Sequence, residues 1–342
     1  MKRIFLLTYL VIIATMLLAQ KPTTTYKPAL DVSIQRIDTE IAHLSLISGG
    51  IVGISAIHAE TGKRIIQNDQ VPFPMASCIK VPIAIELLTK VDSGLYSFDQ
   101  LIEIEKDDLH PGSGLITERF NWPNSLKPGV ALSIRSLLEL MLLISDNSAA
   151  DICLRLAGGP KAVNACMKRL NIEGLRVDRP TSFMIADWYG MKMDKNKQWS
   201  YNLFDSLAKN LTPENEIPDS RKFDSDLQDT STPEAMSDLL LKLLKEPILK
   251  PGSKALLLDI MKRCETGLTR IKGLLPPDTE VMHKTGSIAM TANDVGIITL
   301  PGDGGHVVIS VFVKSSEKGI PDRERAIAEV SRTIYDYFIL NH

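Results

Sequence analysis

The 342-residue sequence has little of several features that define whole classes of protein. Four cysteines are too few for a disulfide-dense scaffold in a chain of this length, and the sequence leaves open whether any of them pair. They are Cys78, Cys153, Cys166 and Cys264. The 39 basic and 41 acidic side chains give a net charge of −2, which offers nucleic acid no electrostatic attraction. We therefore predict no nucleic-acid partner.

Several catalytic and metal-binding motifs are also missing. The sequence has no His-Glu-x-x-His motif and no cysteine–histidine cluster with zinc spacing, and its six histidines are scattered. It has no Gly-x-Ser-x-Gly motif, which disfavours an α/β-hydrolase. The glycine-rich segment Pro301–Gly305 lies between two predicted strands, so it predicts a hairpin and not a phosphate loop. We predict neither a metal site nor a cofactor.

The first twenty residues differ from the rest of the chain. Two basic residues precede an apolar run, Ile4–Leu18, which is interrupted only by two threonines. This pattern predicts a secretory signal peptide over residues 1–20, followed by a polar, proline-flanked linker over 21–28. An uncleaved anchor is the alternative, although about 20 apolar residues are normally needed to span a membrane. We expect an exported protein, periplasmic or secreted, with no membrane association once the signal is removed.

Strand-forming segments occur near both ends of the chain and enclose a helical middle. Periodicity and turn residues predict these elements: helices at 30–44, from Ser133, from Pro233 and at 323–338, and strands at 51–59, 64–67, 280–283, 295–300 and 307–313. This order predicts an α+β fold, with an antiparallel sheet flanked by the N- and C-terminal helices. We assign residues 29–68 and 276–342 to this α/β part and 69–275 to an all-helical part, with an extended loop at about 180–228. The functional site should lie between the two parts.

Three Ser-x-x-Lys motifs occur, at Ser77–Lys80, Ser206–Lys209 and Ser315–Lys318. Only Ser77 opens an apolar helix, which would carry Lys80 inward, one turn away on the same face. Burial lowers the pKa of a lysine towards that of a useful base, and a serine nucleophile needs such a base. A lysine that merely extends to the surface is the alternative for this segment alone.

Two further motifs decide between these interpretations. Ser145-Asp146-Asn147 follows the leucine-rich helix that begins after Ser133, and Lys284-Thr285-Gly286-Ser287 lies on a strand predicted to border the cleft. The three motifs in this order resemble those of class A serine β-lactamases and the related penicillin-binding proteins. The resemblance covers about residues 30–340, and it implies a β-lactamase/transpeptidase-like fold.

The resemblance implies catalytic roles for four residues. Ser77 would be the nucleophile, with Lys80 as a candidate base for acylation, and Ser145 would pass a proton to the departing ring nitrogen. The backbone N–H groups of Ser77 and Ser287 would form the oxyanion hole.

Four more residues would bind the substrate if the resemblance holds. Asn147 would bind the amide of the acyl side chain, while Lys284 and Thr285 would face the substrate carboxylate. Arg270 matches an arginine that supplies a second carboxylate contact in some members of the family. A surface arginine is the alternative interpretation of Arg270.

The sequence departs from the family in the loop that normally carries the glutamate for deacylation. In Arg176-Val177-Asp178-Arg179-Pro180-Thr181, a threonine stands where that glutamate is expected, and a threonine is no carboxylate base. The resemblance implies that Arg179 pairs with Asp229 across the neck of this loop. Asp187, or another carboxylate in the long insertion, could replace the glutamate.

These observations predict a monomeric serine hydrolase that opens the β-lactam ring of penicillin-like antibiotics through an acyl-Ser77 intermediate. Two alternatives use the same serine and lysine. One is a D,D-peptidase or esterase that acts on cell-wall-like peptides, and the other is a penicillin-binding sensor that is acylated without turnover.

Overall fold

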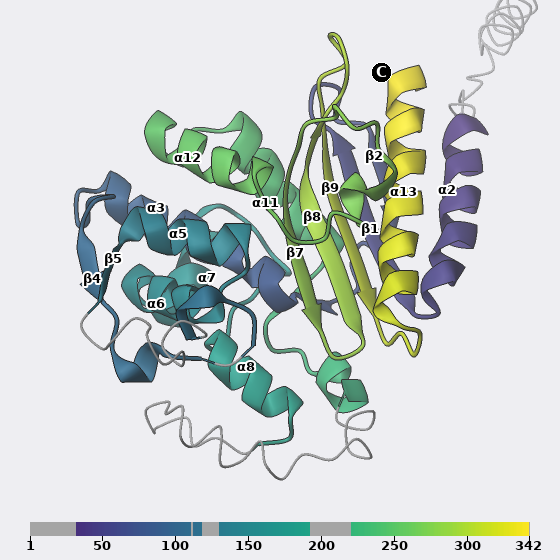
Figure 1. The fold of residues 1–342 in the computed structure, drawn as a ribbon. Coiled ribbons are helices and arrows are strands. Elements are labelled where there is room, and N and C mark those ends of the chain that lie inside the picture. Colours follow the sequence, from purple (N-terminus) through teal and green to yellow (C-terminus); the bar gives the residue numbers. More distant parts are fainter. Residues whose placement is uncertain (1–31, 111, 118–129, 192–219, 342) are drawn as a thin grey trace, which may run out of the picture. The chain divides into compact units, whose positions relative to one another are not determined.

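The structure is a computed structural model that describes residues 32–110, 112–117, 130–191 and 220–341 (Figure 1). The predicted signal peptide and linker and the Ser206–Lys209 motif lie outside the described residues. The chain divides into two units, Met1–Arg36 and Ile37–His342, and the second contains the fold described below. No helix within the described ranges is long and apolar enough to cross a membrane.

A five-stranded antiparallel sheet joins the two ends of the chain in the order β2-β1-β9-β8-β7. Its strands are β1 (Ile51–His58), β2 (Arg64–Gln67), β7 (Val281–Ile288), β8 (Thr291–Thr299) and β9 (His306–Lys314). Strand β7 is longer than the predicted 280–283 and contains the whole Lys284–Ser287 motif. The structure confirms the predicted α+β fold class.

Helices cover both faces of the sheet, which is why β8 and β9 are buried along almost their whole length. The C-terminal helix α13 (Ile320–Asn341) lies on one side and α11 (Pro233–Lys245) on the other (Figure 1). Helix α11 falls within the range assigned to the helical part, yet it packs against β1, β8 and β9. Near the N-terminal end lie α2 (Val32–Ser45) and η1 (Leu46–Ser48).

The helical part has an apolar core built around α3 (Lys80–Asp92), whose first nine residues are all buried. The helices that surround or continue it are η2 (Ala76–Ile79), α5 (Ile134–Leu143), α6 (Asn147–Ala157), α7 (Gly159–Arg169), α8 (Thr181–Trp188) and α12 (Pro251–Lys262). The remaining short elements are β3 (Phe73–Pro74), β4 (Leu101–Glu103), η3 (Lys106–Asp108), β5 (Ala131–Ser133), β6 (Thr230–Ser231) and η4 (Ile271–Leu274).

The predicted helix starts are confirmed by their capping bonds. The Ser133 side chain accepts a hydrogen bond from the backbone N–H of Ser136 at the start of α5. The Thr232 side chain does the same for Ala235 at the start of α11, where Pro233 occupies the first helical position.

All four cysteines are free and buried. Burial raises the pKa of the Cys78 thiol, next to Ser77, to about 12, so this side chain packs as a small apolar group and not as a reactive thiolate.

Candidate active site

The three predicted motifs meet at one cleft of about 450 Å³. Strand β7 and the loop before η4 border it on one side, and η2, α8 and the turn between α5 and α6 border it on the other. The predicted site residues that line it are Ser77, Ser145, Asn147, Arg270, Thr285 and Ser287. Segments up to 210 residues apart in the sequence therefore form one concave site.

The segment that carries Ser77 is held in an unusual conformation. Ala76 has φ 47°, in the left-handed region that residues other than glycine rarely adopt, and Ser77 follows it in η2. The Asn293 side chain of β8 donates hydrogen bonds to the carbonyl oxygens of Pro74 (2.8 Å) and Met75 (3.0 Å). The sheet thus fixes the backbone immediately before the candidate nucleophile.

Gly286 allows β7 to approach this segment closely. A Cβ atom at Gly286 would lie 2.5 Å from the Met75 carbonyl oxygen and 3.0 Å from the backbone nitrogen of Ser77. Any side chain here would therefore displace the Ser77 backbone from β7. This contact places the backbone of Ser77 beside the Lys284–Ser287 motif.

Lys80 is fully buried, as predicted, and its amine is bound on three sides. Its Nζ contacts the Ser145 carbonyl oxygen (2.8 Å), the Ser145 Oγ (3.1 Å) and the Asn147 Oδ1 (2.9 Å). Burial lowers the pKa of Lys80 well below its ordinary value, and the nearby Lys284 charge lowers it further. Within the described structure, no hydrogen bond joins Lys80 to the Ser77 hydroxyl. The hydrogen bonds of Lys80 with residues of the cleft are therefore those to Ser145 and Asn147.

Lys284, on β7, also contacts Ser145. Its Nζ lies 3.0 Å from the Ser145 Oγ and 2.9 Å from the Thr285 carbonyl oxygen, and the side chain is fully buried. Burial lowers the pKa of Lys284. Ser145 itself has φ 61° and is fixed by Ser113, whose Oγ donates to the Ser145 carbonyl oxygen at 2.8 Å. Two lysines from different parts of the fold thus converge on one hydroxyl.

Arg270 lines the cleft but is only 5% exposed, so its interpretation as a surface arginine is wrong. Its guanidinium donates to the carbonyl oxygens of Gly286 (3.1 Å) and Asn293 (2.7 Å) and to the Ser287 Oγ (2.5 Å). It also forms an ion pair with Glu324 of α13 at 3.1 Å. These contacts tie the end of β7 to β8 and to the C-terminal helix.

The cleft contains residues that the motifs did not identify. Helix α8 lies inside the stretch predicted as an extended loop, and Thr181, Met184, Ile185 and Trp188 of this helix line the cleft. Their spacing of three and four residues, after Pro180, is a helix signal that the sequence did contain. Trp188 stacks on Tyr189 with ring centroids 4.6 Å apart, and both line the same wall.

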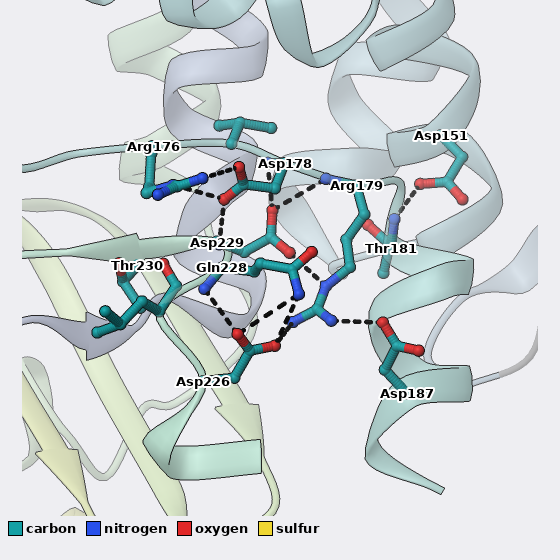
Figure 2. Close-up of polar contacts among 12 residues, drawn as sticks. Asp151, Arg176, Asp178, Arg179, Thr181, Asp187, Asp226, Gln228, Asp229 and Thr230 are labelled. Atoms are coloured by element: carbon teal, nitrogen blue, oxygen red, sulfur yellow. Dashed lines mark hydrogen bonds and ion pairs between the residues drawn. The ribbon is translucent and has the colours of Figure 1, made fainter. Parts of the chain in front are cut away.

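The neck of this loop is an ionic network centred on Arg179 (Figure 2). The Arg179 Nε lies 2.6 Å from Asp229, as the resemblance implied, and the remaining guanidinium nitrogens pair with Asp187 and with Asp226 (3.1 Å for Asp226). Burial raises the pKa of Asp229 to about 6, while the Arg179 charge acts in the opposite direction. The network holds α8 against the segment that leads into β6.

Carboxylates close to α8 do not line the cleft. Asp187 pairs with Arg179, and Asp151 of α6 accepts hydrogen bonds from the backbone N–H groups of Thr181 (2.6 Å) and Ser182 (3.0 Å; Figure 2 shows the bond to Thr181). Among the described residues, the cleft lining contains no aspartate or glutamate. Asp187, the suggested replacement for the glutamate, is therefore part of the loop neck.

Comparisons with known proteins agree with this geometry. A family model described as the β-lactamase enzyme family matches residues 36–338. The chain is 31% identical to β-lactamase VEB-1 of Pseudomonas aeruginosa, over 84% of this chain and 85% of that protein. Among solved structures, a β-lactamase from Chitinophaga pinensis has a TM-score of 0.70 at 29% identity, covering 88% of this chain and 98% of that one. An ancestral class A β-lactamase has the same score and identity, covering 88% and 99%.

The matches span both the sheet and the helical part, so the relationship includes the whole cleft. The chain therefore belongs to the β-lactamase enzyme family, and its similarity to class A members confirms the resemblance inferred from the three motifs.

Proposed function

We propose that the protein hydrolyses β-lactams by transferring the ring acyl group to Ser77 and then to water. Relatives that are named β-lactamases, together with the family match, support this activity. The observation that carries the mechanism is the convergence of Lys80 and Lys284 on the hydroxyl of Ser145, inside the cleft that Ser77 lines.

In the first step, the Ser77 Oγ attacks the β-lactam carbonyl carbon and its proton passes to the amine of Lys80. The depressed pKa of Lys80 supplies a neutral amine at lower pH than an exposed lysine would. The backbone N–H groups of Ser77 and Ser287 would stabilise the oxyanion, with each such donor worth about 3 kcal/mol. The close approach of β7 at Gly286 brings these two backbone segments together.

The ring nitrogen must gain a proton as the C–N bond breaks. Ser145 is suited to this step because its hydroxyl contacts both lysine amines: it can give its proton to the nitrogen and regain one from Lys80. Lys284 and Thr285 would face the substrate carboxylate, and Asn147 would bind the amide of the acyl side chain.

We also propose that the protein is exported and acts as a monomer on its small-molecule substrate, without membrane association. The basic N-terminus and the apolar run Ile4–Leu18 support export through a signal peptide. Mass measurement of the protein recovered from the periplasm or the medium would test it: export predicts a mature chain that begins near residue 21, and a full-length protein in the membrane fraction would contradict it.

The direct test is turnover of a chromogenic cephalosporin by the purified protein, with intact-mass analysis during the reaction. We expect sustained turnover and a transient adduct, both abolished in Ser77→Ala. A stable adduct without turnover would instead indicate a penicillin-binding sensor. If no adduct forms but an acyl-D-Ala-D-Ala peptide is cleaved, the protein is a peptidase.

A further inference from the structure

The face of α8 that borders the cleft carries no group that could activate water as a carboxylate does. Thr181, Met184, Ile185 and Trp188 occupy this face. A general base commonly contributes about 10²–10⁴-fold to a hydrolytic step, so within the described part of the cleft another proton acceptor must serve the turnover of an acyl-serine ester.

Described carboxylates of α8 and α6, and of the turn before α6, have other partners. Asp151 binds two backbone N–H groups at the start of α8, and Asp187 pairs with Arg179. Asp146 caps α6 through the backbone N–H of Ala149 (2.8 Å) and also accepts from the N–H of Ile116 (2.9 Å). Their oxygens are therefore engaged in these contacts.

The contacts of Lys80 fit a neutral amine. Such an amine has two N–H donors and one lone pair. The Ser145 carbonyl oxygen and the Asn147 Oδ1 can only accept, so they take the two donors. The third contact is the Ser145 Oγ, to which the Lys80 Nζ donates in the structure; with a neutral amine, the Ser145 hydroxyl would instead donate its proton to the lone pair while it accepts from Lys284.

Charged and titratable groups surround Lys80 from several elements. Lys284 of β7 disfavours a second positive charge, while Asp146 in the turn before α6, Asp151 of α6 and Cys78 of η2 act in the opposite direction. Burial is the largest influence, and it favours the neutral form. The amine is therefore available as a base after the acyl-enzyme has formed, once its proton has left with the ring nitrogen.

We propose that Lys80, acting through the Ser145 hydroxyl, is also the base for deacylation and so replaces the missing glutamate. This inference rests on the proposed acylation of Ser77. A water oxygen attacks the ester carbon of acyl-Ser77 and gives a proton to the Ser145 Oγ, which passes its own proton to the Lys80 Nζ. When the ester C–O bond breaks, Ser77 Oγ takes a proton back along the same path, which restores the neutral amine and releases the acid.

The test measures the loss of a preformed adduct. Wild type, Lys80→Ala and Ser145→Ala are incubated for hours with excess benzylpenicillin and then desalted, and the acyl adduct is followed by intact mass. We expect the adduct to disappear at least about 100-fold more slowly in both variants, as the loss of a general base predicts. Adduct loss from Lys80→Ala at the wild-type rate would overturn the inference and leave the acylation of Ser77 intact. If wild type forms no adduct and shows no turnover, the proposed function itself fails.

Two further measurements keep the result decisive even if the variants acylate poorly. In wild type, a pH jump after acylation should show adduct loss that slows as the pH is lowered, because protonation of the Lys80 amine removes the base. A rate that does not fall as the pH is lowered would contradict the inference. Asp187→Asn is the matched control: we expect a rate within about threefold of wild type, and a fall of about 100-fold would identify Asp187 as the base instead.

Discussion

Lys80 and Lys284 contact the same hydroxyl, the Oγ of Ser145, at 3.1 and 3.0 Å. Each lysine is fully buried, and they come from α3 and β7, more than 200 residues apart in the sequence. Two ammonium groups this close repel each other, so one of them is favoured as a neutral amine. Burial lowers the pKa of both lysines, and the charge of Lys284 lowers that of Lys80 further, which favours the neutral form of Lys80.

Replacing Lys284 should affect both binding and chemistry. In Lys284→Ala, we expect KM for carboxylate-bearing β-lactams to rise about 10-fold or more, since a charge-assisted hydrogen bond contributes about 1.5–3 kcal/mol. Because the Ser145 hydroxyl loses a donor, kcat should fall as well. Steady-state kinetics would measure both, with Lys284→Arg as the control that keeps the charge. An unchanged KM would show that Lys284 does not bind the substrate.

A side chain at Gly286 should separate Ser77 from β7. The added Cβ in Gly286→Ala would meet the Met75 carbonyl oxygen at 2.5 Å, so the two backbones must move apart. A donor displaced from the oxyanion hole costs about 10²–10³-fold in kcat, and we expect a loss of this size for acylation. Stopped-flow acylation kinetics would test it, together with the melting temperature of the variant to exclude general unfolding. Acylation at the wild-type rate would show that the contact is not needed.

Arg270 should matter for stability more than for substrate choice. Its guanidinium supports Gly286, Asn293 and Ser287 and pairs with Glu324, so Arg270→Ala leaves buried acceptors without donors. We expect unfolding to become easier by about 3–5 kcal/mol, the usual cost of breaking a buried ion pair. Chemical denaturation would measure this, and Glu324→Gln should show a smaller effect. A normal stability combined with a raised KM for carboxylate-bearing substrates alone would instead support the role implied by the family.

The loop neck should control the position of α8. Arg179→Ala removes the partner of Asp229, Asp187 and Asp226 and leaves the Asp229 carboxylate buried without its counter-charge. We expect a stability loss of about 3 kcal/mol or more and an α8 that exchanges its amide hydrogens faster. Hydrogen exchange would locate the effect, and Arg176→Ala, which removes an exposed arginine paired with Asp178, is the control. If the amide hydrogens of α8 exchange at the same rate in both variants, the network does not control the position of this helix.

Trp188 should select the acyl side chain of the substrate. It stacks on Tyr189 and lines the cleft beside Met184 and Ile185, so it offers an apolar wall to an aromatic group. In Trp188→Ala, we expect kcat/KM to fall about 10-fold for β-lactams with an aryl side chain, as loss of an aromatic contact of about 1 kcal/mol plus buried area predicts. Substrates with a small side chain should be affected little. An equal loss for both kinds would indicate a general disturbance of α8.

The sequence by itself determined the elements and the identity of the chemistry. Runs of β-branched residues bounded by turn residues predicted the strands, and Ser133 as a cap and Pro233 as a first helical residue predicted helix starts. Ser77 and Lys80 had to lie one turn apart because both belong to one helical segment. These are local properties, set by contacts within a few residues.

Only the tertiary structure decided which distant groups meet. Spacing in the sequence could not show that Lys80 contacts Ser145, that Arg270 is buried against β7 and β8, or that Asp187 pairs with Arg179. It also could not show that α8 presents Thr181 and Trp188 to the cleft while its one acidic side chain lies in the loop neck. The physical reason is that burial and ion pairing depend on segments brought together by packing. Burial and ion pairing in turn decide whether a charged side chain acts as a base, stabilises the fold or lies on the surface.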